Sequence, residues 1–277
     1  MDLTLQVRGN WRLRKDNCTY SQLWLDLKRG QTPGTIFENQ NRLKLVVQCR
    51  RQDRYADLIV KEQQAYQIFE ELSDYNFDTR LLNVTYADSE REGSTRTHLG
   101  FFIEHQNRLQ ERFGMEEVEL NNIPFRELNA PQASLTALFM LMIGNTDFSI
   151  SQAPEGDECC HNAKLLVNDS GEYFAIPYDF DASGFVDAPY AAPPAPAMNI
   201  RNNRQRAYRG YCAHNDSLES ATSALQQART QILSIVSDES RVSSRTANTS
   251  SKYVQDYYEI LDTPRSFQRS IIDDCRG

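Results

Sequence analysis

Hydrophobic and polar residues alternate through much of the first hundred residues of the chain. Such alternation is typical of half-buried strands, and short apolar runs of similar length are typical of buried strands. The predicted strands span residues 3–9, 22–28, 42–49, 80–88 and 97–104. A stripe of apolar residues at helical spacing predicts one helix from about residue 53 to 72. We therefore expect residues 1–108 to form a β-rich lobe that contains one helix.

The remainder of the chain, residues 109–277, has the pattern of a mainly helical lobe. Residues 134–144 are almost wholly apolar, which predicts a helix buried on most sides. Two amphipathic helices are expected at about 216–236 and 250–274. Before them, residues 163–181 have the pattern of a β-hairpin whose turn is Asn-Asp-Ser-Gly. The sequence thus predicts an α+β fold of two lobes, with a ligand cleft between them.

The composition excludes several classes of protein. The net charge of −8 and the pI of about 5.1 argue against a surface that binds nucleic acid. The mean hydropathy is −0.62 and no apolar run approaches the length of a membrane span, so no transmembrane helix is expected. The first ten residues lack the charged and apolar regions of a signal peptide.

The chain has six cysteines and no Cys-x-x-Cys pair, which argues against a zinc ribbon or a thioredoxin-type site. An even number of scattered cysteines fits either disulfides in an oxidising compartment or a set of buried thiols. We expect several bridges and a location outside the cytoplasm, and Cys18 and Cys49 flank neighbouring predicted strands. For the other four, the candidates are loops that join Cys212 or Cys275 to Cys159 or Cys160.

One carboxylate lies within the apolar stripe of the predicted helix 53–72. This residue is Glu62, and a buried carboxylate is costly unless it is paired or hydrogen-bonded. Lys44, on the predicted strand 42–49, is the candidate partner. Kinases use such a pair to fix the lysine that contacts the nucleotide phosphates. The alternative is that Glu62 lies at the edge of the stripe and Lys44 extends to water.

A second group of polar residues follows the predicted buried helix. Asp147 ends the sequence Gly-Asn-Thr-Asp, Asn162 precedes the first strand of the predicted hairpin, and Asp179 follows the second. Because a hairpin brings its outer ends together, Asn162 and Asp179 are expected to be neighbours. Carboxylate and amide oxygens can hold Mg²⁺, while a further carboxylate faces an attacking hydroxyl. Taken alone, a Gly-Asn-Thr-Asp sequence at a helix end is most commonly only a helix cap and an Asx turn.

These motifs occur in a recognisable order along the chain. An early Arg-Gly-Asn at 8–10 is followed by the lysine strand, the helix, Gly-Asn-Thr-Asp, Asn-x-x-Leu and Pro-Tyr-Asp-Phe-Asp. This order resembles the spore coat protein H-like family of atypical protein kinases, and more closely a group of uncharacterised bacterial proteins. The resemblance covers nearly the whole chain. It implies a two-lobed protein-kinase-like fold with its catalytic segment at 143–184.

The resemblance also assigns roles to particular residues. Asp147 resembles the catalytic aspartate that orients the acceptor hydroxyl. The implied metal ligands are Asn162, Asp179 and Asp181, of which the last completes an Asp-x-Asp typical of the family. The implied nucleotide-binding residues are Lys44, its helix partner Glu62, Glu104 near the adenine, and Gly9, the lone glycine of the first strand.

The function that follows from the resemblance is phosphoryl transfer. The expected enzyme binds ATP with Mg²⁺, or with Mn²⁺, and phosphorylates a hydroxyl, most simply that of a Ser or Thr in a protein. One alternative is a pseudokinase, which binds nucleotide or a partner without turnover. Another is an enzyme of the same fold that transfers AMP or that phosphorylates a small molecule.

Overall fold

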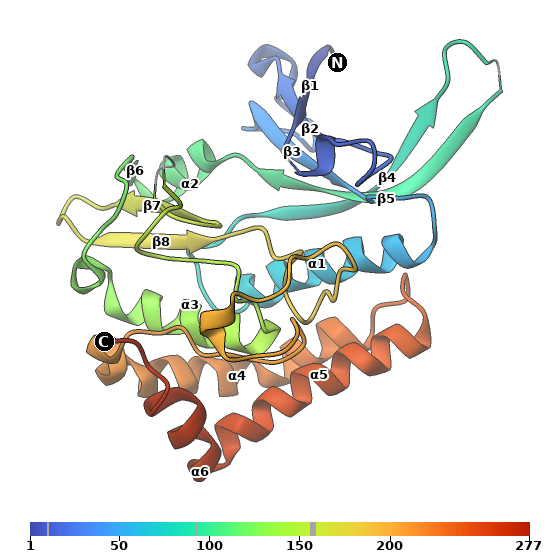
Figure 1. Cartoon of the computed structure of the whole chain (residues 1–277). Coiled ribbons are helices and arrows are strands. Elements are labelled where there is room, and N and C mark those ends of the chain that lie inside the picture. Colours follow the sequence, from blue (N-terminus) through green and yellow to red (C-terminus); the bar gives the residue numbers. More distant parts are fainter. Residues whose placement is uncertain (10, 92, 156–158) are drawn as a thin grey trace.

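The alternating segments of the first hundred residues pair into one antiparallel sheet. In the computed structural model, which describes residues 1–9, 11–91, 93–155 and 159–277, this sheet has five strands in the order β1-β2-β3-β5-β4 (Figure 1). The strands are β1 (Leu3–Arg8), β2 (Gln22–Leu27), β3 (Arg42–Val47), β4 (Thr79–Ala87) and β5 (Thr95–Glu104). Lys44 lies in the central strand β3, opposite Trp24 of β2 and Ile103 of β5.

The predicted helix is α1 (Arg54–Glu70), and it packs against β4 and β5. Its apolar residues, including Ile59, Tyr66 and Phe69, are buried in the main core. Figure 1 shows α1 between the sheet and the helices of the C-terminal half. The apolar residues of α1 are therefore buried on two sides of the helix, by the sheet and by α4.

The C-terminal half consists mainly of helices around α3 (Ala130–Ile143). Every residue from Gln132 to Ile143 is buried, which confirms the prediction of a helix enclosed on most sides. Helices α4 (Leu218–Ser237) and α5 (Ser244–Asp262) pack against α3. The preceding helix α2 (Gln106–Phe113) follows β5 directly.

The last predicted helix, 250–274, is wrong in its extent. The structure has α5, then the short α6 (Pro264–Phe267), then one π-helical turn at Gln268–Ile272. Thr263 is extended because the residue before a proline avoids the helical region. Pro264 therefore ends α5 and begins the next helix.

The predicted hairpin is present as β7 (Ala163–Val167) and β8 (Tyr173–Pro177), with β6 (Glu116–Glu117) beside β7. In its turn, the side chain of Asn168 accepts hydrogen bonds from the backbone of Ser170 and Glu172. At the open end, the Tyr178 amide donates to the Asn162 carbonyl at 2.9 Å. The hairpin therefore brings residue 162 next to residues 178 and 179, as its pattern predicts.

All six cysteines form disulfides, namely Cys18–Cys49, Cys159–Cys160 and Cys212–Cys275. The expectation of several bridges is thus confirmed, including the bridge between the neighbouring strand ends. The expected loops from residues 159 or 160 to 212 or 275 are wrong, because Cys159 pairs with Cys160 and Cys212 pairs with Cys275. Three disulfides are typical of proteins that fold in an oxidising environment. Over the described ranges, no helix has the length and apolar character needed to cross a membrane.

Candidate active site

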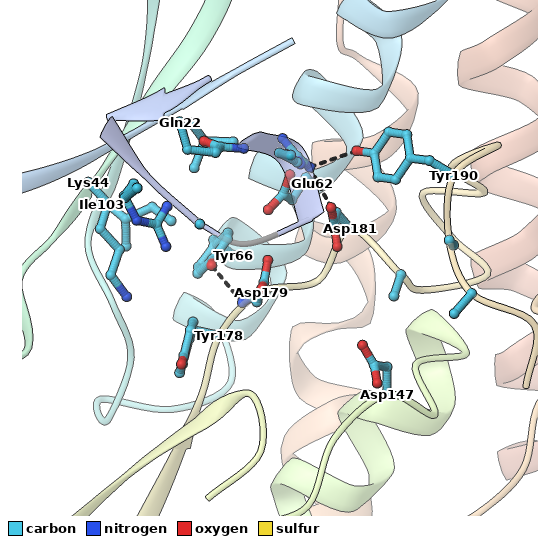
Figure 2. A pocket seen from close by; sticks show the side chains of 17 residues that line it. Gln22, Lys44, Glu62, Tyr66, Ile103, Asp147, Tyr178, Asp179, Asp181 and Tyr190 are labelled. Carbon is cyan, nitrogen blue, oxygen red and sulfur yellow. Dashed lines mark hydrogen bonds and ion pairs between the residues drawn. The ribbon is translucent and has the colours of Figure 1, made fainter. Parts of the chain in front are cut away.

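A cavity of about 320 Å³ lies where the sheet and α1 face the segment that follows β8. Figure 2 shows its lining side chains converging from these elements. Six of the eight site residues predicted from the sequence line it, and two do not. The charged residues of the lining are Arg8, Arg12, Lys44, Glu62, Asp147, Asp179 and Asp181.

The two aspartates after β8 are held by the aromatic residue between them. Phe180 is fully buried and packs on the rings of Tyr66 and Phe139, with centroids 4.5 Å and 5.3 Å away. The Asp179 amide donates to the Tyr66 hydroxyl at 2.9 Å, as Figure 2 shows, and its φ of 63° lies in the left-handed region. Burial, reinforced by the charge of Asp181, raises the pKa of Asp179 to about 6. This segment therefore presents two closely spaced carboxylates to one cavity.

The cation that pairs with this acid cluster is Arg12, a residue that no sequence pattern indicated. Its guanidinium is buried and donates to the Asp181 carboxylate, to the Tyr190 hydroxyl at 2.7 Å and to the Val47 carbonyl at 3.3 Å. Burial and the charge of Asp181 raise the pKa of Glu62 well above its usual value, and Arg12 opposes this rise. Arg12 therefore links the turn after β1 to α1 and to the segment after β8.

The predicted ion pair between Lys44 and Glu62 is wrong. Over the part of the chain that the structure describes, the Lys44 ammonium has no ion pair, and it lies 4.2 Å from the centroid of the Tyr178 ring. Burial, reinforced by the charge of Arg8 and opposed by that of Asp179, lowers the pKa of Lys44 to about 7. Glu62 instead lies beside Arg12, so the helix carboxylate and the strand lysine share the cavity without contact.

Asp147 follows α3 through a turn that also has an ordinary structural explanation. Gly144 caps the helix in the left-handed conformation, and the Asn145 side chain accepts from the Asp147 amide at 2.9 Å. The helix cap and Asx turn that the sequence left open are therefore present. Neither the cap nor the turn uses the Asp147 carboxylate, and Asp147 lines the cavity.

The Asp147 carboxylate is held by the two residues that precede β7. His161 Nε2 lies 2.9 Å from its Oδ1, and Asn162 Nδ2 donates to its backbone carbonyl at 2.6 Å and to its Oδ2 at 3.3 Å. The hydrogen bond from His161 lowers the pKa of Asp147, and the same bond raises the pKa of His161. Asn162 therefore lies beside Asp147, and its amide faces Asp147 and does not line the cavity, so its role as a metal ligand stays a prediction.

The His161–Asp147 hydrogen bond predicts a pH-dependent contribution to stability. Because the folded-state pKa of His161 is raised, this contribution is fully present below pH 6.5 and is lost as the pH rises through the raised value. His161→Asn should therefore lower the free energy of unfolding more at about pH 5.5 than at about pH 9, as measured by urea denaturation. The matched control is His98→Asn. Burial lowers the pKa of His98, so this control should show the opposite trend with pH.

Of the two remaining predicted nucleotide residues, Glu104 lies outside the cavity and Gly9 lines it. Glu104 is buried and accepts from Arg112 at 2.6 Å and from the Asp78 amide at 2.9 Å. Burial raises its pKa to about 7 in spite of these partners. It does not line the cavity, so its side chain ties β5 to α2 and its predicted contact with a nucleotide stays a prediction. Gly9 does line the cavity and has a φ of 89°, whereas Asn10 of the Arg-Gly-Asn motif lies outside the described residues.

The donor set suits a hard divalent cation when a nucleotide supplies the other ligands. No group of three His, Cys, Asp or Glu side chains within the described ranges is arranged to hold a metal by itself. Mg²⁺ at nucleotide sites is commonly held by one or two carboxylates together with phosphate oxygens and water. Asp179 supplies one such carboxylate, and Arg12 engages only one oxygen of Asp181, which leaves the other. The residues therefore fit Mg²⁺ or Mn²⁺ bound together with ATP.

Comparison of the chain with protein-family models, with curated proteins and with solved structures found no match. The chemistry of this cavity therefore has to be judged from its own geometry.

Proposed function

We propose that the chain is an ATP-dependent phosphotransferase with a two-lobed, protein-kinase-like architecture and a spore coat protein H-like site. One observation carries the proposal. A buried strand lysine, two carboxylates that follow a hairpin and the carboxylate that follows α3 all line one cavity. This is the set of groups that phosphoryl transfer requires, because the reaction depends on positioning and on neutralising charge.

Each group has a role in the proposed reaction. Lys44 and Arg8 would bind the phosphates of ATP, and Asp179 with Asp181 would hold the metal. When bound, Mg²⁺ neutralises charge on the phosphate oxygens. Asp147 accepts the proton of the acceptor hydroxyl, whose oxygen forms a bond to the γ-phosphorus. The bond from that phosphorus to the β–γ bridging oxygen breaks, and ADP leaves.

The alternative of a nucleotide-binding scaffold without turnover is favoured by one contact. Arg12 already engages Asp181, so the second predicted metal ligand has a partner inside the protein.

A thermal-shift titration with ATP, GTP and ADP, each with Mg²⁺, Mn²⁺ or no metal, tests the binding of nucleotide. Transfer of label from γ-labelled but not α-labelled ATP identifies a kinase, and transfer from α-labelled ATP alone identifies an AMP transferase. The three disulfides support a site of action outside the cytoplasm.

Replacing Asp147 with Asn is expected to slow phosphoryl transfer while leaving the binding of ATP almost unchanged. The amide keeps the shape of the side chain and removes the group that accepts the hydroxyl proton, which is typically worth about 10²–10⁴-fold in rate. The measurement is kcat with labelled ATP alongside the thermal shift produced by ATP and Mg²⁺. Asp169→Asn, in the exposed turn between β7 and β8, is the matched control. A variant that keeps the wild-type rate would remove Asp147 from the reaction.

A further inference from the structure

A second cavity, of about 430 Å³, adjoins the first and shares Asp147 with it. Ala182 and Ala192 also line both cavities, so the two meet around the carboxylate that we assign to proton transfer. Figure 2 shows Asp147 set apart from the carboxylates of Asp179 and Asp181. A hydroxyl that approaches Asp147 from the second cavity would therefore leave the first cavity to the nucleotide.

The second cavity contains two arginines, Arg209 and Arg276. One guanidinium of the pair, that of Arg209, donates to the Thr146 carbonyl and lies 5.2 Å from the Phe148 ring centroid. Over the described ranges neither arginine forms an ion pair, and Nε of Arg209 has no hydrogen-bond partner. Burial, reinforced by the nearby charge of Arg276, lowers the pKa of Arg209 to about 10. Two neighbouring cations without an ion-paired carboxylate are stabilised by a bound anion.

Backbone hydrogen bonds join the two segments that carry these arginines. The Arg276 amide donates to the Gly210 carbonyl at 2.8 Å, and the Cys212 amide donates to the Arg276 carbonyl at 2.9 Å. The disulfide between Cys212 and Cys275 joins the same two segments. The pair is therefore positioned before any ligand arrives, which lowers the entropic cost of binding. Guanidinium groups bind carboxylate and phosphate oxygens through two parallel hydrogen bonds, so both kinds of anion suit this site.

We propose that the second cavity binds the acceptor, and that the acceptor carries a carboxylate or a phosphate close to the hydroxyl that is phosphorylated, an inference that rests on the proposed function. The hydroxyl faces Asp147 and His161, while the anionic group lies against Arg209 and Arg276. Such an acceptor is either a free hydroxy acid or sugar-type phosphate, or a Ser or Thr flanked by acidic residues in a peptide. The arginines would then select the acceptor, and Asp147 would activate it.

The test compares anionic acceptors with neutral counterparts. The purified protein with Mg²⁺ and ATP is offered glycerol, D-glycerate and glycerol 3-phosphate, and peptides whose Ser is flanked by Glu or by Gln. We expect kcat/KM for an anionic acceptor to exceed that for its neutral counterpart by at least about 10²-fold, because a neutral ligand leaves the two half-buried cations unpaired. The free compounds and the peptides show which source of anion the cavity accepts.

Variants identify the residues responsible for this preference. Arg209→Gln and Arg276→Gln should each remove most of it by raising KM for the anionic acceptor, with no change in KM for ATP. Arg269→Gln, at an exposed position of the C-terminal turn, is the matched control and should leave both constants unchanged. Equal use of neutral and anionic acceptors, or a raised KM for ATP in the arginine variants, would overturn the inference. In the second case the arginines would be binding the nucleotide.

Direct binding separates this inference from the proposed function. Calorimetric titration with D-glycerate and glycerol 3-phosphate needs no ATP and is repeated on Arg209→Gln. If these compounds bind through Arg209 while ATP neither binds nor turns over, the anion site stands and the phosphotransferase proposal fails. If ATP is turned over while neither compound nor the acidic peptide binds, the phosphotransferase stands and the anionic acceptor is excluded.

Discussion

Asp179→Asn is expected to abolish metal-dependent binding of ATP and, at the same time, to stabilise the ligand-free protein. Both effects come from the same carboxylate. Burial and the charge of Asp181 raise the pKa of Asp179 from 3.8 to about 6, so its ionised form is unfavourable in the folded protein. A shift of this size corresponds to a cost on the order of 2–3 kcal/mol above that pH. The amide removes that cost together with the ligand for the metal.

The sign of the pH dependence follows from the raised pKa. A carboxyl group whose pKa is raised on folding contributes stability below its unfolded-state pKa of 3.8. This contribution is lost as the pH rises through the folded-state pKa of about 6. The gain in unfolding free energy of Asp179→Asn over the wild type should therefore be larger at about pH 8 than at about pH 4, as measured by urea denaturation.

The choice of asparagine matters because of the backbone. Residue 179 has a φ of 63°, a conformation that Asn adopts far more readily than Ala. A loss of ATP binding in Asp179→Asn therefore cannot be attributed to a strained turn. Asp169→Asn makes the same chemical change at an exposed position and should alter neither property. Retention of a metal-dependent thermal shift with ATP in Asp179→Asn would remove this residue from the metal site.

Local patterns in the sequence were sufficient to predict most helices and strands. The short apolar run that predicted residues 42–49 reflects the central strand β3, in which every residue from Leu43 to Val47 is buried. The strand predicted at 97–104 is β5, whose burial increases toward its C-terminal end. Helix α2 was not delimited because it is only eight residues long and its apolar stripe consists of two residues, Leu109 and Phe113. The extent of the last helix was wrong because the apolar period continues past Pro264 while the backbone cannot.

The candidate site was predictable where it depends on local geometry, and not where it depends on long-range contacts. Hairpin geometry placed Asn162 near Asp179, and the turn after α3 placed Asp147 at the same end. The sequence also indicated that Glu62 needs a cation. It favoured Lys44 as that cation because Lys44 lies in a clearly predicted strand. Arg12 lies in a 3₁₀ helix of only three residues, and its partner Asp181 is 169 residues away. No periodic pattern links such residues.

Arg12→Met is expected to have the largest effect on stability of any change at the cavity. The buried guanidinium satisfies Asp181, Tyr190 and the carbonyl of Val47, and its charge favours ionised Glu62. Removing one partner of a buried ion pair leaves an uncompensated charge, which typically costs about 3–5 kcal/mol. The measurement is the free energy of unfolding in urea at neutral pH. Arg14→Met, at an exposed position two residues along, is the matched control and should change stability by less than about 0.5 kcal/mol.

A double variant separates the charge of Arg12 from its packing. If uncompensated charge is the main cost, Arg12→Met combined with Asp181→Asn should recover a large part of the stability that Arg12→Met loses, because the unpaired carboxylate is gone. No recovery would mean that the loss comes from the contacts with Tyr190 and Val47. Equal stabilities of Arg12→Met and Arg14→Met would contradict the assignment altogether. Glu62 would then be neutralised by its own proton, as its raised pKa allows, and Asp181 would be free to serve the metal alone.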